Sequence, residues 1–130
     1  MKFFKSLFAS ANLFTINSAS AKAFTEGWPQ IKIYYEILSK VFHASEKGNL
    51  DNIKSDSWML VEKAEALSIE GMPAEYRNPK TLETLLALKK QTKFVDDLVK
   101  DAAADPEIKK ALSKLYDIFH LIVELCLSEK

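Results

Sequence analysis

The chain has 130 residues, and 18 Lys and Arg are balanced by 18 Asp and Glu, so its formal net charge is zero. This length makes one domain, and the charge balance argues against nucleic-acid binding, which usually needs an excess of Lys and Arg. A single Cys excludes an internal disulfide and the cysteine-only zinc sites.

Residues 1–23 have the layout of a secretory signal peptide. Lys2 and Lys5 precede an apolar run at residues 7–16. Small residues follow, with an A-x-A pattern at Ala21 and Ala23, which predicts cleavage after Ala23 and a periplasmic or secreted domain at residues 24–130. Apolar residues here also recur at helical spacing, so a retained interfacial amphipathic helix is the alternative. A transmembrane helix needs about 20 apolar residues, and this run is shorter.

After a linker at Phe24–Gly27, the sequence predicts a first helix. It begins with Pro29 at position N1, where the missing N–H costs nothing, and Gly48 ends it at the C′ position. His43 lies on its polar face and is expected at the surface. Apolar residues at steps of three and four predict the buried face: Ile31, Tyr34, Tyr35, Leu38, Val41 and Phe42.

A second helix is predicted from its cap, Asn49, to the stop signals Gly71 and Pro73. Its apolar stripe is thinner than those of the other helices and contains two serines, Ser57 and Ser68. Carboxylates outside the stripes alternate with lysines on outer faces, which predicts a solvated surface. They include Glu62, Glu65, Glu70, Asp96 and Asp97.

Asn78 and the proline after it predict the cap and first residue of a third helix. Its buried face is predicted to reach Ala102, but the apolar pattern slips along the helix. Leu82 and Leu86 lie well round from the main face, so this helix is expected to touch more than one neighbour. We predict that these two leucines meet a protein partner or another subunit; the alternatives are that they cover the end of the bundle or dock the linker near Trp28.

The last helix, predicted at residues 106–127, has the widest apolar stripe, and Asp105 is its expected cap. Several other helices must cover such a stripe. Short turns make the four predicted helices antiparallel neighbours, so the fold class is an all-α, up-down-up-down four-helix bundle. The stripe consists of Ile108, Leu112, Leu115, Phe119, Ile122 and Cys126.

His120 is the candidate ligand of the last helix. It lies at the boundary of the stripe. We expect either a histidine that is hydrogen-bonded to a neighbour or an imidazole that titrates or binds a metal. An antiparallel bundle sets it level with Tyr34 and Tyr35, and sets Cys126 near the end that receives Met72. Imidazole, thiolate and thioether suit a soft ion such as Cu(I). However, about 9 Å and 120° separate His120 from Cys126 on the helix, so both cannot bind one ion directly without distortion.

Several segments carry a resemblance at the level of layout: Tyr35–Leu38, Gly48–Asp51, Ala64–Leu67, Leu85–Leu88 and Leu112–Phe119. Their arrangement resembles that of small exported four-helix bundles of the cytochrome b562 and cytochrome c′ type. It is also similar to an uncharacterised helical domain that accompanies heavy-metal efflux adaptors in bacterial envelopes. The haem-attachment cysteines of the c′ group and a Met-rich metal tail are missing from the sequence, so no family site residue is carried over.

The sequence contains no Gly-rich phosphate loop, no Glu-x-x-His pair and no C-x-x-C-H haem attachment. We therefore predict an exported, non-enzymatic bundle that presents one face to a protein partner or serves as a structural module, with no cofactor. The alternative is a periplasmic bundle that handles copper or another soft metal through His120, with Cys126 or Met72.

Overall fold

A computed structural model describes residues 24–127; the predicted signal peptide at residues 1–23 and residues 128–130 lie outside the described part. The described residues form no β-strand, and the all-α class is confirmed. Besides a helical turn at residues 24–27, they form four long α-helices and one short 3-10 helix: α3 (Pro29–Glu46), α4 (Asp51–Glu65), η1 (Ala74–Tyr76), α5 (Pro79–Lys100) and α6 (Asp105–Leu127).

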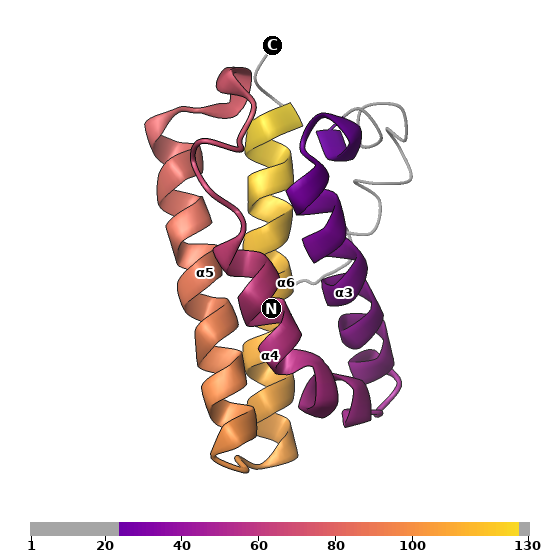
Figure 1. Cartoon of the computed structure of the whole chain (residues 1–130). Coiled ribbons are helices and arrows are strands. Elements are labelled where there is room, and N and C mark those ends of the chain that lie inside the picture. The colour runs from indigo at the N-terminus through magenta and orange to yellow at the C-terminus, as the bar shows by residue number, and fades with distance from the viewer. Residues whose placement is uncertain (1–23, 128–130) are drawn as a thin grey trace.

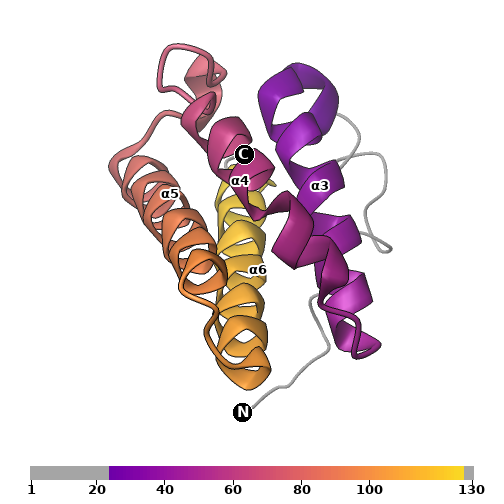
Figure 2. The same ribbon diagram turned by 60° about the horizontal axis from the view of Figure 1, so that its bottom comes forward.

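Figure 1 shows α3, α5 and α6 running lengthwise beside one another, with α4 lying across the front between α3 and α5. Figure 2, in which the bottom of the molecule comes forward, shows α6 beside α5, with only the upper end of α6 behind α4. The most extensive contact joins α5 to α6, and α4 packs on both α3 and α5. Short turns join α3 to α4 and α5 to α6, whereas a longer segment at residues 66–78 leads from α4 to α5.

The predicted helix ends are mostly confirmed. Gly48 has a φ of +87°, and its N–H bonds to the carbonyl of Ser45, as in a C-terminal cap with a left-handed residue. Asn78 caps α5, since its side chain accepts from the N–H of Thr81 at 2.9 Å. Asp105 is the first residue of α6, and its carboxylate accepts from Lys54 Nζ at 2.8 Å.

The helix α4 is shorter than predicted, because it ends at Glu65 instead of near Gly71. Leu67 and Met72 are nonetheless buried, at 0% and 1% exposure. In a continued helix Met72 would lie about 100° from the buried face, so leaving the helix early lets both side chains enter the core. Arg77 holds this segment together by donating to the carbonyl oxygens of Met72 and Glu70.

Phe24–Gly27, predicted to be a linker, is helical instead. The ring of Phe24 is fully buried. It lies edge-on to Trp28, with ring centroids 6.0 Å apart, and 5.7 Å from the ring of Tyr76. These three aromatic rings tie the start of α3 to the segment before α5 and close this end of the core.

A buried polar contact joins α3 to α5 inside the core. The hydroxyls of Tyr34 and Thr92 are 2.8 Å apart, and Thr92 donates its proton to the carbonyl of Leu88 at 2.7 Å. Because Thr92 has only one hydroxyl proton, Tyr34 must be the donor to Thr92. Burial raises the pKa of Tyr34, which keeps the phenol protonated.

Ala102 was predicted to lie on the buried face of α5, and this was wrong. The helix ends at Lys100, and Ala102 is exposed with a φ of +56°. Its N–H bonds to the carbonyl of Val99, and the next N–H, of Ala103, bonds to that of Leu98. This is the Schellman pattern, in which glycine usually occupies the left-handed position.

Ala102→Gly should therefore raise the free energy of unfolding by about 0.5–1 kcal/mol. The left-handed conformation costs a residue with a Cβ about 1–2 kcal/mol, and glycine gives back roughly half of this through its greater freedom in the unfolded chain. Urea denaturation measures the difference. Ala104→Gly is the matched control, because Ala104 is exposed and has no positive φ; an equal gain there would contradict the explanation.

Candidate functional site

His120 lies inside the bundle, not at its boundary, since only 5% of it is exposed. Its ring is 4.4 Å from that of Tyr116, which in turn stacks on Phe42 at 3.9 Å. Burial lowers the pKa of His120 to about 4, so the imidazole is neutral at pH 7. The residue before it, Phe119, stacks on Tyr35 at 5.2 Å, so the predicted level of His120 along α3 is confirmed.

Cys126 and Met72 are each 1% exposed. Burial is the main cause that raises the pKa of Tyr76, and the neighbouring Cys126 raises it further. Tyr76 ends η1, in the same connecting segment as Met72. The thiol and the thioether therefore belong to the same end of the bundle, as the sequence predicted, whereas His120 lies about 9 Å back along α6.

Among residues 24–127, no group of three or more His, Cys, Asp or Glu side chains could hold a metal ion. The predicted metal site also includes the thioether of Met72, and methionine is not one of these four residue types. Metal binding by His120, Cys126 and Met72 stays a prediction. His43, predicted at the surface, is exposed and pairs with Glu46 at 3.6 Å.

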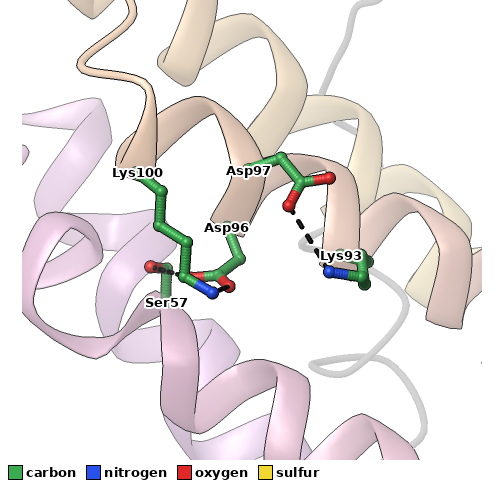
Figure 3. A network of polar contacts seen from close by, with 5 residues as sticks. All are labelled: Ser57, Lys93, Asp96, Asp97 and Lys100. Carbon is green, nitrogen blue, oxygen red and sulfur yellow. Dashed lines mark hydrogen bonds and ion pairs between the residues drawn. The ribbon is translucent and has the colours of Figure 1, made fainter.

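Asp96 was predicted to be a solvated carboxylate, and this was wrong, because it is only 3% exposed. Figure 3 shows Asp96 between α5 and α4, where Ser57 Oγ donates to one carboxylate oxygen at 2.7 Å. Lys100 Nζ lies 2.9 Å from the other oxygen. Burial by itself raises the pKa of Asp96, but the bonds from Lys100 and Ser57 outweigh it and hold the pKa below its usual value.

One sequence signal did point to this buried contact. Ser57 stands inside an otherwise apolar stripe, and a buried hydroxyl needs a hydrogen-bond partner. The hydrogen bond from Ser57 to Asp96 joins α4 to α5, so it helps to fix the two helices on one another.

The outer face of α5 carries two of the large apolar side chains that remain in water. Leu86 is 61% exposed and Phe94 is 49% exposed. Leu82, which the sequence grouped with Leu86, packs partly against the core. Trp58, on α4, is also exposed. Leu86 is thus exposed and Leu82 is partly buried, and a partner surface at these two leucines stays a prediction.

Two open grooves meet at Phe94. The α4–α5 groove has a volume of about 470 Å³ and is lined by Val61, Ala64, Glu65, Lys89, Lys90, Lys93, Phe94 and Asp97. The α5–α6 groove has a volume of about 440 Å³ and is lined by Gln91, Phe94, Leu98, Glu107, Lys110, Ala111 and Lys114. The phenyl ring is the feature that both grooves share.

Positive charge gathers around this ring. The two grooves are lined by five lysines and three carboxylates, although the whole chain has no net charge. Lys93 pairs with Asp97 at 3.5 Å. Within the described residues, the other four lysines of the grooves form no ion pair: Lys89, Lys90, Lys110 and Lys114.

No helix within residues 24–127 has the length and apolar character needed to span a membrane. No protein-family model, curated protein or solved structure matches the chain. The layout resemblance to exported four-helix bundles therefore stays a prediction, and the function must be argued from the residues themselves.

Proposed function

We propose that the protein is an exported, non-enzymatic module in which an up-down-up-down four-helix bundle presents the outer face of α5 to a protein partner. The observation that supports this role is the pair of exposed apolar side chains, Leu86 and Phe94, on one helix whose opposite face already fills the core. Export is inferred from the signal-like layout of residues 1–23.

The energetics of Phe94 favour a binding role. Each Å² of apolar surface that a partner removes from water stabilises the complex by about 25 cal/mol. Aromatic side chains that stand in or beside a pocket are the residues that most often dominate binding energy at interfaces. Phe94 lies outside the hydrophobic core and is half-exposed, so a partner can bury the remaining surface of its ring.

A site-specific cross-linking experiment tests this proposal. The full-length protein is produced in its native host with photoreactive benzoylphenylalanine in place of Phe94 or Leu86. The matched control carries it in place of His43, which is also exposed but lies on α3. We expect one discrete adduct, and only from the two α5 positions. The partner in that adduct, once purified, should bind the wild-type protein and bind Phe94→Ala more weakly. Equal adducts at all three positions, or none, would contradict the proposal.

A further inference from the structure

The α4–α5 groove indicates what kind of partner segment it receives. Its apolar lining is formed by Val61, Ala64 and the half-exposed ring of Phe94. A groove between two helices with such a lining is the type of surface on which an amphipathic helix lays its apolar face. A membrane surface, by contrast, would favour apolar side chains that protrude together from a convex face.

The charges on α5 set the polarity of that helix. Lys89 and Lys93 are four residues apart, about 6 Å along α5. Residues three or four apart on a partner helix have the same spacing, so two carboxylates on one face can reach both lysines. Lys90 is the third lysine of this groove.

The α4–α5 groove is lined by three lysines and by two carboxylates, Glu65 and Asp97, so one positive charge is in excess. Lys93 already has a carboxylate neighbour, Asp97, whereas within the described part of the chain Lys89 and Lys90 form no ion pair. Charge complementarity of this kind chooses a partner and speeds its association more than it raises affinity. An acidic helix satisfies these lysines, and a basic one is repelled.

We propose that the α4–α5 groove binds an acidic amphipathic helix of the partner protein. Its apolar stripe lies on Phe94 and Val61, and its carboxylates face Lys89, Lys90 and Lys93. This inference rests on the proposed function, because it names the chemistry of the partner at the same face of α5.

A peptide panel tests the inference with the full chain. Three fluorescent helical peptides share one leucine stripe and differ only in the polar face, which is Glu, Gln or Lys. Anisotropy titrations at low and high ionic strength measure binding. We expect the Glu peptide to bind more tightly than the Gln peptide, to weaken as salt rises, and the Lys peptide not to bind.

Two variants locate the binding to the groove. The triple variant Lys89→Gln, Lys90→Gln, Lys93→Gln should weaken binding of the Glu peptide about tenfold, because each exposed charge pair contributes a small, additive part. Phe94→Ala should weaken it by a similar factor and also weaken the Gln peptide. The matched control changes three exposed lysines of α3 and its C-terminal cap to Gln, and should bind as wild type: Lys32, Lys40 and Lys47.

Several outcomes would overturn the inference. These are failure of the Glu peptide to bind, equal binding of the Lys peptide, or equal losses in the triple variant and its control. Phe94-dependent dimers in light scattering would identify a second copy of the chain as the occupant. Sedimentation with phosphatidylglycerol vesicles without peptide binding would identify a membrane. A cross-linked partner at Phe94 together with a negative peptide panel would leave the proposed function standing and remove only the acidic helix.

Discussion

Lowering the pH from 7 to 4 should reduce the free energy of unfolding by about 3 kcal/mol through His120 alone. Burial lowers the pKa of this imidazole from 6.5 to about 4 in the folded protein. Between these values the unfolded chain binds a proton that the folded protein does not, so stability falls as the pH falls. Urea titrations at closely spaced pH values measure this slope.

Two variants assign the slope to its residue. His120→Gln removes the titrating group and should flatten the stability profile between pH 6.5 and 4, whatever its effect at pH 7. His43→Gln changes the exposed histidine of α3 and should leave the profile as in the wild type. A slope that persists unchanged in His120→Gln would show that another group is responsible.

The sequence predicted those parts of the fold that depend on local chemistry. Pro29 and Asn78 mark helix starts because a missing N–H and a short polar side chain act within one turn of the chain. Gly48 marks a helix end because few other residues adopt its left-handed φ. The wide stripe of α6 was also predicted correctly, because nearly all of its buried residues are apolar.

The errors lie where tertiary contacts override the local pattern. Asp96 is a charged residue at the edge of a buried face. Its burial is stabilised by Lys100, one turn further along α5, and by Ser57 on α4, and the bond from Ser57 depends on how the two helices pack. The helix α4 ends at Glu65, and Leu67 and Met72 beyond it are buried in the core; no local signal predicts this end. Ala102 takes the place of glycine because α5 must turn sharply into α6.

The candidate site was predicted only in part, for a related reason. Leu86 was predicted because it lies well round from the main face of its helix, whereas Phe94, which is 49% exposed, was not predicted. Its importance depends on two grooves that neighbouring helices form beside it. Likewise, single lysines are unremarkable in a neutral chain, and their gathering around one ring appears only when α5 and α6 pack side by side (Figure 1).

The buried carboxylate of Asp96 provides the second large effect. Asp96→Ala should lower the free energy of unfolding by about 2 kcal/mol, because it removes a charge-assisted hydrogen bond and leaves the hydroxyl of Ser57 without its acceptor in the core. Asp97→Ala is the matched control, since Asp97 is the next residue but half-exposed, and its ion pair with Lys93 contributes little. Chemical denaturation at pH 7 compares the two variants.

The pH at which this contribution disappears separates Asp96 from His120. The folded-state pKa of Asp96 is below its usual value, so its contribution is present above about pH 4 and is lost as the pH falls through the lowered pKa. His120 acts between pH 6.5 and 4, and Asp96 acts below pH 4. Asp96→Ala should therefore keep the slope above pH 4 and lose part of the slope below it.

The double variant Ser57→Ala, Asp96→Ala should be less destabilised than the sum of the single variants, because the two groups share one hydrogen bond (Figure 3). If the two effects are strictly additive, the hydrogen bond between Ser57 and Asp96 does not stabilise the fold.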